Sequence, residues 1–386
     1  MNIALSHEDV LLRDTVRDFF DKEVIPHEEM VDRLGEVPEE IGRDIEAKAK
    51  ALGLYAANLP DRVGGGNLSH TQMALIEREF GRTSHALHSW IARPTELLLA
   101  CEGEQVDKYL MPCVTGEKRE LFALTEPEAG SDAMGMRTNA RQDGRDWILN
   151  GTKHFISAPT MADFAIVFAV TGTDETKRGP RKRITAFLVD RDMPGVVFHE
   201  GNKCVSNRGY KTYELSFDNV RLGPRQVLGE EGRGFDLAGQ WLGMARIWVG
   251  ATCCGKAERL LELATDWSAN RKQFGKPIGT FQATGFRLAD MSIGLRTADL
   301  LVFDAVRRAD AGEMRDEDAA MVKVYCSEVL HKIADDTVQI YGGMGLMEEL
   351  PVQRLWRDSR IERIWDGTSE IQRHIITRSI LRPLGA

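Results

Sequence analysis

The sequence lacks the features that mark membrane-spanning, secreted and metal-binding proteins. Its longest apolar runs, such as FAIVFAV at 164–170, fall far short of the roughly 18 residues that a membrane-spanning helix needs. Its six cysteines form no Cys-x-x-Cys pair and no Cys/His spacing typical of zinc sites, so we expect buried free thiols. Residues 1–30 carry many acids and no apolar stretch, which argues against a signal peptide. We therefore expect a cytoplasmic protein without a membrane partner or a metal.

Basic stretches are also scarce. The chain has 50 Lys and Arg against 59 Asp and Glu, a net charge of -9, and its densest basic run is the short KRGPRKR at 177–183. This balance argues against nucleic acid as a partner. The composition, 42% hydrophobic over 386 residues, is that of a globular protein long enough to bury a large core, in two or three domains or in one large compound unit.

Residues 1–118 have helical periodicity. Ser6 and Asp9 are spaced as an N-cap pair, and Val16 and Phe19 follow at a helical interval. Prolines and glycines interrupt the block repeatedly. We expect an N-terminal domain of short helices.

Residues 119–228 have the pattern of strands. In TYELSFDNV, apolar and polar residues alternate, which places Tyr213 and Leu215 on the same face of a strand. Asn150-Gly151 lies between two apolar runs and predicts a hairpin turn. Because no long helix separates these strands, we expect an antiparallel β-barrel or sandwich.

Residues 229–386 return to helical spacing. Apolar residues recur every three or four positions along two stretches, namely Leu288, Met291, Leu295, Ala298 and Val302, then Val322, Cys326, Val329 and Ile333. Long amphipathic helices of this kind predict an antiparallel bundle. The chain is therefore expected to be α+β, with ligand sites in the crevices beside its middle domain.

Four segments have unusual chemistry. LFALTEPEAGSD at 121–132 is a polar loop rich in donors, able to bind a planar heterocycle or a phosphate, although an ordinary turn can look the same. ANRKQFGKPIGTFQ at 269–282 sets cations beside a bend, which suits a pyrophosphate or a solvated helix end. YGGMGL at 341–346 follows a helical run and not a strand, so it fails as a Rossmann turn. RIERIWDGTSEIQR at 360–373 places Asp366 beside a glycine, as a turn residue or as a catalytic base.

Taken together, these segments resemble the acyl-CoA dehydrogenase family over nearly the whole chain. The shared segments follow the family's order and separation: ALTEPEAGSD, LNGTKHFISAPTMAD, YELSFDNVRL, LGEEGRGF, NRKQFGKPIGTFQ, QIYGGMG and RIWDGTSEIQR. The resemblance implies helical N-terminal, middle β and C-terminal four-helix domains in a homotetramer. It implies non-covalent FAD between the middle and C-terminal domains, in an enzyme of fatty acid or acyl-CoA catabolism. Members oxidise the Cα–Cβ bond of an acyl-CoA thioester and pass electrons to an electron-transfer flavoprotein.

The resemblance also assigns residues to the cofactor. Those expected along the flavin of the same subunit are Phe122, Leu124, Thr125, Ser131, Phe155 and Ser157. The family usually has Trp at Phe155 and often Thr at Ser157, so an aromatic face and a hydroxyl are retained. Those expected to reach the FAD of a neighbouring subunit are Arg271, Phe274, Gln339, Gly342 and Gly343. Thr368 and Glu370 would flank the diphosphate.

For the substrate, the resemblance places Ser131 near the CoA chain and leaves Arg246 and Arg378 as cationic partners at the CoA entrance. Gly243 stands where well-known members often have an acid near the pantetheine. Trp241 and Trp248 lie near the expected acyl pocket, where core packing is the simpler role.

Asp366 stands where most members have the glutamate that removes the Cα proton while a hydride leaves Cβ for flavin N5. Some branches place the base before an arginine on an earlier helix, but that position here is Ala245, before Arg246. Aspartate is shorter by about 1.5 Å, and a misplacement of about 1 Å can lower a rate on the order of 10²-fold. The substrate therefore sits closer, or has a more acidic proton, or reacts more slowly.

Two other interpretations remain open from the sequence. Nitroalkane-oxidase-like flavin oxidases share the fold and use an aspartate base on a carbon acid without CoA. A non-catalytic subunit would lack flavin altogether. Acyl length and type, and the electron acceptor, are not determined by the sequence.

Overall fold

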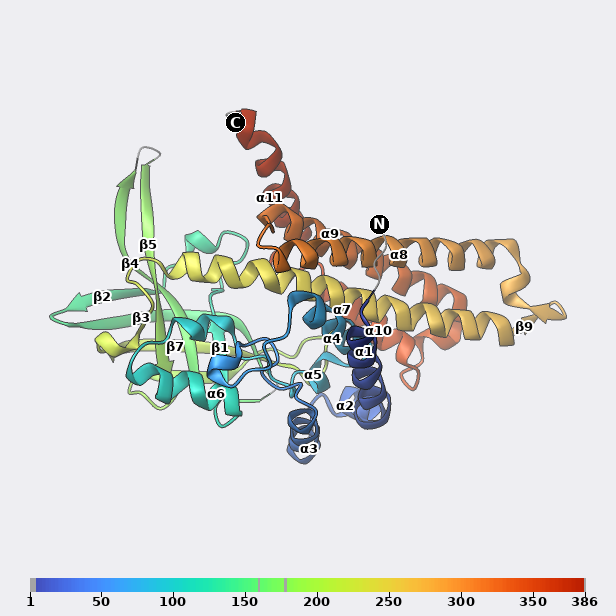
Figure 1. Ribbon diagram of the computed structural model, residues 1–386, viewed down its shortest axis with the longest axis horizontal. Helices are drawn as coiled ribbons and strands as arrows, with labels where there is room; N and C mark the ends of the chain where they lie inside the picture. The colour runs from blue at the N-terminus through green and yellow to red at the C-terminus, as the bar shows by residue number, and fades with distance from the viewer. Residues whose placement is uncertain (1–4, 159, 177–178, 385–386) are drawn as a thin grey trace.

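The computed structural model describes residues 5–158, 160–176 and 179–384 (Figure 1). The predicted order of a helical, a β and a second helical region is confirmed. The sheet lies at one end of the molecule, and the longest helix, Gly234–Asn270, runs from it toward the opposite end (Figure 1). No helix in the described ranges is both long and apolar enough to cross a membrane.

The N-terminal region consists of short helices. They are α1 (His7–Phe19), α2 (Glu28–Leu34), α3 (Glu39–Ala51), α4 (His70–Gly81), α5 (His85–His88) and α6 (Met111–Thr115). The predicted cap of α1 is confirmed, since the Ser6 hydroxyl accepts from Asp9 N and the Asp9 carboxylate accepts from Ser6 N, both at 3.1 Å. Val16 and Phe19 are buried, and α4 packs against α7 of the C-terminal region.

The middle region is one eight-stranded sheet. Its strands are β1 (Glu120–Ala123), β2 (Asn139–Asp143), β3 (Asp146–Ala158), β4 (Phe164–Thr176), β5 (Gly179–Asp190), β6 (Val196–Glu200), β7 (Lys211–Leu222) and β8 (Val227–Leu228). Their order is β6-β7-β3-β2-β4-β5-β8, with β1 beside β4. Most neighbours are antiparallel as predicted, but β1 and β2 both run parallel to β4. Tyr213 and Leu215 are buried on one face of β7, which confirms the alternation.

The predicted hairpin at Asn150-Gly151 is wrong. The β2–β3 turn is at Gly144 and the following residue, and β3 continues through Asn150 and Gly151. The register between β3 and β7 shifts there, with Asp218 and Asn219 of β7 opposite Asn150 alone, so the β-bulge lies on β7. Gly151 has φ 144°, and a Cβ there would lie 2.4 Å from Thr138 Oγ1, which explains the glycine.

The C-terminal region is a helical bundle. Its helices are α7 (Gly234–Asn270), α8 (Gln282–Asp310), α9 (Asp316–Tyr341), α10 (Pro351–Ile361) and α11 (Ser369–Leu381). α7, α8 and α9 pack on one another, and α10 and α11 pack on α9. Most of the predicted apolar stripe is buried, including Met291, Leu295 and Val302. The short hairpin β9 (Lys272–Gln273) and β10 (Lys276–Pro277) lies at the end far from the sheet (Figure 1).

Candidate active site

Asp366 lies in the turn between α10 and α11. Its φ of 51° is left-handed, and Gly367 follows at 93°. A left-handed conformation costs a non-glycine residue on the order of 1–3 kcal/mol, so surrounding contacts must hold it. Thr368 then begins α11 as its N-cap, with its hydroxyl accepting from Ile371 N at 3.3 Å. The Asp-Gly pair is thus a turn, and this turn presents a carboxylate.

Two side chains hold the carbonyls of this turn. The fully buried Lys323 of α9 donates from Nζ to Gly367 O at 2.7 Å. The fully buried Gln372 of α11 donates to Gly367 O at 2.9 Å and to Asp366 O at 3.2 Å. Both flanking helices therefore fix the backbone on which Asp366 stands.

A buried ion pair between α7 and the segment before Asp366 also supports this turn. Lys256 of α7 pairs with Glu362, and both side chains are 1% exposed. The second carboxylate oxygen of Glu362 accepts from Trp365 Nε1 at 2.8 Å. The residue immediately before Asp366 is thereby tied to α7.

The charges around Asp366 act in opposite directions. Burial raises the pKa of Asp366, and Glu362 adds to this effect, whereas Lys323, Arg246 and Arg93 lower it. The net direction is upward. A carboxylate with a raised pKa is a stronger base once it is deprotonated, which suits proton removal from carbon.

The expected flavin loop is fixed by a buried lysine. Lys153 of β3 has no exposure and donates to Leu124 O at 2.9 Å and to Glu126 Oε1 at 2.8 Å. His154 N donates to Thr125 O at 2.9 Å. Burial lowers the pKa of Lys153 to about 8, and Glu126 opposes that shift. β3 and the loop after β1 therefore form one rigid unit.

An aromatic chain joins β3 to the Asp366 turn. Tyr210 Oη donates to Ser157 O at 3.3 Å. The His85 ring lies 4.4 Å from the Tyr210 ring and 4.9 Å from the Trp365 ring, measured between centroids. His85, Tyr210 and Trp365 are each partly exposed. These three side chains form a short wall, with the predicted flavin strand at one end and the turn of the predicted base at the other.

Other residues predicted to contact the FAD differ in how exposed they are. The Phe122 ring packs at a tilt against the Trp241 ring with centroids 4.3 Å apart, which ties β1 to α7. Phe155 has φ 54° and is 64% exposed, so its ring is available to a ligand. Ser131 lies on an exposed part of its loop, and Glu370 is exposed on α11.

The second predicted group gathers at the far end of the bundle. A cavity of about 500 Å³ is lined there by Arg271, Gly342, Gly343 and Tyr341, among others. Phe274 nearby, in the β9–β10 turn, is 92% exposed. Gln339 is exposed on the last turn of α9. This end is opposite the sheet in Figure 1, so one chain separates its two sets of predicted cofactor residues.

The predicted CoA partners differ in placement. Arg246 is partly exposed and acts on Asp366, and its Nε has no hydrogen-bond partner in the described structure. Arg378 is exposed on α11. Trp248 is 8% exposed within the core, which supports a packing role.

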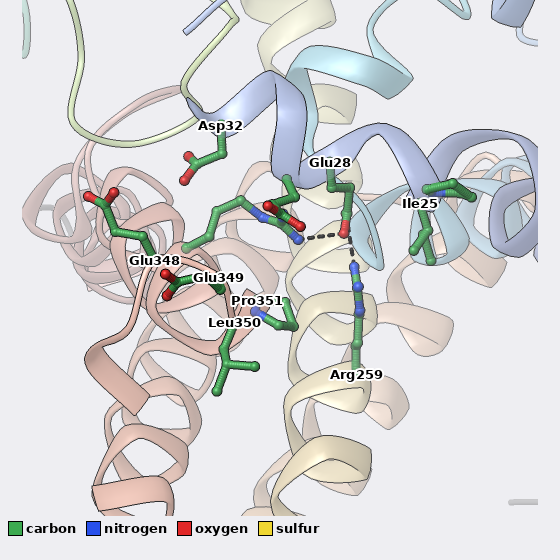
Figure 2. A pocket seen from close by; sticks show the side chains of 11 residues that line it. Ile25, Glu28, Asp32, Arg259, Glu348, Glu349, Leu350 and Pro351 are labelled. Carbon is green, nitrogen blue, oxygen red and sulfur yellow. Dashed lines mark hydrogen bonds and ion pairs between the residues drawn. The ribbon is translucent and has the colours of Figure 1, made fainter. Parts of the chain in front are cut away.

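A smaller cavity, of about 200 Å³, lies outside this site (Figure 2). Its central carboxylate, Glu28, is buried and paired with Arg259 and Arg354 (Figure 2). Thr83 and Ser84 also donate to Glu28. The ion pairs of Glu28 with Arg259 and Arg354 therefore link α2 to α7 and α10.

Sequence reasoning did not single out His85, Arg93, Tyr210 or Lys323. Lys323 had a detectable signal, because it is the one charged residue in the otherwise apolar run AAMVKVYC at 319–326. The other three stand in unremarkable local sequence.

Comparisons with known proteins place the chain in a family. Models of the acyl-CoA dehydrogenase N-terminal, middle and C-terminal domains match residues 6–117, 121–220 and 232–381. The chain is 36% identical over 377 residues to a 3-(aryl)acrylate reductase of Clostridium sporogenes, covering 96% of this chain and 98% of that one. It is 35% identical over 383 residues to the caffeyl-CoA reductase-Etf complex subunit CarC of Acetobacterium woodii, covering 98% and 99%. The structure of butyryl-CoA dehydrogenase from Megasphaera elsdenii matches with a TM-score of 0.88 at 33% identity, covering 99% and 100%.

The chain therefore belongs to the acyl-CoA dehydrogenase family. It is a flavin-dependent oxidoreductase that acts on a CH–CH bond, and the predicted fold and enzyme class are confirmed.

Proposed function

We propose that the enzyme oxidises the Cα–Cβ bond of an acyl-CoA thioester to the 2-enoyl-CoA, with FAD as cofactor and Asp366 as the base. The observation that carries this proposal is the short wall of Tyr210, His85 and Trp365 between Ser157 and Asp366. A substrate must lie between a base and a flavin, and these contacts join the Asp366 turn to the strand predicted to contact the flavin.

The residues present fit a flavin. The loop after β1 offers hydroxyl and backbone donors fixed by Lys153. Phe155 offers an exposed aromatic ring. A bound FAD would supply the acceptor for the hydride that leaves Cβ. Thr368 and Glu370, at the start of α11, would flank its diphosphate.

The protein's own part in the reaction is proton removal and positioning. Asp366 takes the Cα proton, and its rigid turn keeps the carboxylate at one place. Such general-base help contributes roughly 10²- to 10⁴-fold. Arg246 supplies positive charge on the same side, and Ser131 and Arg378 remain proposed CoA contacts.

The cavity at the far end of the bundle supports sharing of FAD between subunits. Arg271, Phe274, Gln339, Gly342 and Gly343 would serve the cofactor of a neighbour, in a homotetramer. An electron-transfer flavoprotein is the proposed acceptor, because one relative is named as a subunit of an Etf complex. Free buried cysteines support a cytoplasmic location.

Anaerobic titration with a panel of acyl-CoAs tests the proposal. An oxidisable acyl-CoA should bleach the flavin absorbance, and the 2-enoyl-CoA should be recovered. Asp366→Asn should lower the bleaching rate by at least about 10²-fold, whereas Asp366→Glu should retain part of it. Full activity of Asp366→Asn would show that the base lies elsewhere.

One observation favours a second candidate, a flavin oxidase of nitroalkane-oxidase type. Aspartate replaces the usual glutamate at the base position. In such an oxidase, a nitroalkane instead of an acyl-CoA would bleach the flavin, and the reduced flavin would reoxidise rapidly in air.

A further inference from the structure

Lys256 lies in the middle of α7, and its ammonium is buried. It pairs with the carboxylate of Glu362, and each of the two side chains is 1% exposed. Replacing a buried ion pair with apolar side chains of similar volume often leaves stability unchanged or raised. The charge-assisted hydrogen bond of such a pair does, however, fix the relative orientation of its two groups. Positioning therefore explains this pair better than stability does.

The Glu362 carboxylate leads to the predicted base. Glu362 is the C-cap residue of α10 and stands four positions before Asp366. Its second oxygen accepts from Trp365 Nε1 at 2.8 Å, and Trp365 N donates to Ile361 O at 3.2 Å. Trp365 is thus held by both its side chain and its backbone. Because Asp366 follows directly, these contacts restrain the backbone from which its carboxylate projects.

A second carboxylate of α10 leads to the predicted flavin strand. Asp358 lies one helical turn before Glu362, on the same side of the helix, and is 2% exposed. Its Oδ1 accepts from Asn207 N at 2.6 Å, in the loop between β6 and β7. Asn207 O accepts from Tyr210 N at 2.9 Å, and Tyr210 Oη donates to Ser157 O of β3 at 3.3 Å. One turn of α10 therefore connects to both the base and β3.

The charge of Lys256 acts on both of these carboxylates. Burial lowers the pKa of Lys256, but Glu362 and Asp358 outweigh burial, so the net direction is upward. Burial raises the pKa of Asp358, and Lys256 opposes that rise, as do Arg354 and Arg357. The buried ammonium is therefore charged, and it attracts two acids of α10 toward α7.

The aromatic wall joins the two sets of contacts at their far ends. The His85 ring lies 4.9 Å from the Trp365 ring and 4.4 Å from the Tyr210 ring, measured between centroids. The ion pair, the contacts of the two carboxylates and this wall thus form a closed ring of contacts. A closed ring resists the displacement of any one member.

We propose that Lys256 is a positioning residue that holds the Asp366 carboxylate at a fixed separation from β3, acting through Glu362 and Asp358. The inference rests on the proposed function, because it assumes that the substrate lies between Asp366 and a flavin at β3. Aspartate has a short reach, so the place of its backbone is decisive. A displacement of about 1 Å can lower a rate on the order of 10²-fold.

A double variant separates positioning from stability. Lys256→Met combined with Glu362→Leu replaces the ion pair with apolar side chains, which should cost less stability than Lys256→Met alone. In the FAD-loaded enzyme, kcat for an oxidisable acyl-CoA should fall about 10- to 100-fold, with little change in KM. Anaerobic flavin bleaching measures the rate, and urea unfolding shows that the variant is folded.

The pH profile of the same variant gives a second readout. Burial is the main cause of the raised pKa of Asp366, and Glu362 adds to it. Removing the Glu362 charge lowers that pKa, so the acid limb of kcat/KM should move to lower pH. Trp365→Phe keeps the ring and every charge but removes the donor to Glu362. This variant should lower kcat several-fold and leave the acid limb in place.

Hydrogen exchange tests the positioning without a substrate. The backbone amides at 362–372 and at 201–210 should exchange faster in the double variant than in the original protein, both loaded with FAD. The matched control is Lys108→Met with Asp190→Leu. This is also an ion pair whose carboxylate accepts from an aromatic side chain, Tyr109, at 3.0 Å. The control should change neither kcat nor the exchange of the two segments.

The outcomes distinguish two failures. An unchanged kcat together with unchanged exchange at 362–372 overturns the positioning role of Lys256 and leaves the proposed function standing. A loss of activity that the control variant shares also overturns it. If no acyl-CoA bleaches the flavin of the original protein, the proposed function fails, and the exchange rates still decide whether Lys256 holds the two segments.

Discussion

Lys323 donates from Nζ to the carbonyl oxygen of Gly367 at 2.7 Å, from a side chain with no solvent exposure. This one bond links the middle of α9 to the turn that carries Asp366. The same ammonium lowers the pKa of Asp366, so Lys323 affects both the position and the basicity of the carboxylate.

Replacing Lys323 with methionine should change the pH profile as well as the rate. Asp366 must be deprotonated to accept a proton, so activity is lost as pH falls through its pKa. Removing the cation raises that pKa, and the acid limb of kcat/KM should move to higher pH. Loss of the turn contact should lower kcat on the order of 10²-fold.

The matched control is Lys332→Met on the same helix, whose ammonium is exposed and paired with Asp336. The Lys332→Met variant should leave the pH dependence of kcat/KM unchanged. An unchanged acid limb in a folded Lys323→Met enzyme would contradict a direct effect on Asp366.

The Lys256–Glu362 pair should behave as a buried unit in stability measurements. Lys256→Met leaves Glu362 charged and unpaired, and should destabilise the protein by about 3–5 kcal/mol. The double variant Lys256→Met, Glu362→Leu should lose less than Lys256→Met alone. Urea unfolding of these two variants and of Glu362→Leu completes the cycle, and strictly additive losses would show that the two groups do not interact.

Lys153→Met should weaken flavin binding without altering Asp366. The substitution removes the donor to Leu124 O and the cation beside Glu126, so the loop after β1 becomes less ordered. The dissociation constant of FAD should rise roughly tenfold. Fluorescence titration of the apoenzyme measures it, with Lys211→Met on the same sheet as control. Equal FAD affinity in the two variants would rule out this role.

Two inactive variants should complement each other if FAD is shared between subunits. Asp366→Asn damages the base, and Arg271→Glu damages the cavity at the far end of the bundle. In a mixed dimer, one site carries both changes and the other carries neither. After random mixing, about a quarter of the sites should be intact. If the activity of the mixture never exceeds that of either variant alone, the whole cofactor site lies within one chain.

Structural features that depend on residues close together in the sequence were predicted correctly. The Ser6 cap, the alternation of β7 and the apolar face of α8 follow from local spacing. Asn150-Gly151 failed because pairing with β7 outweighs the local turn preference of an Asn-Gly pair. The irregularity is a bulge on β7, where Asp218 and Asn219 lie opposite Asn150, and Gly151 keeps its φ of 144° within β3.

The candidate site was predicted only in part, for a similar reason. Asp366 was identified by its position in a recognisable segment. Arg93, Tyr210 and Lys323 come from three other parts of the chain, and only the packing of α9 and the sheet brings them near it. No spacing along the sequence indicates such an encounter.

The length of α7 has a consequence for how the enzyme is handled. Its 37 residues correspond to about 55 Å of helix, with the sheet at one end and the Arg271 cavity at the other. If each flavin needs one end from each of two chains, dilution that separates the chains also releases the yellow cofactor. Colour, oligomer size and activity should then fade together as the protein concentration is lowered.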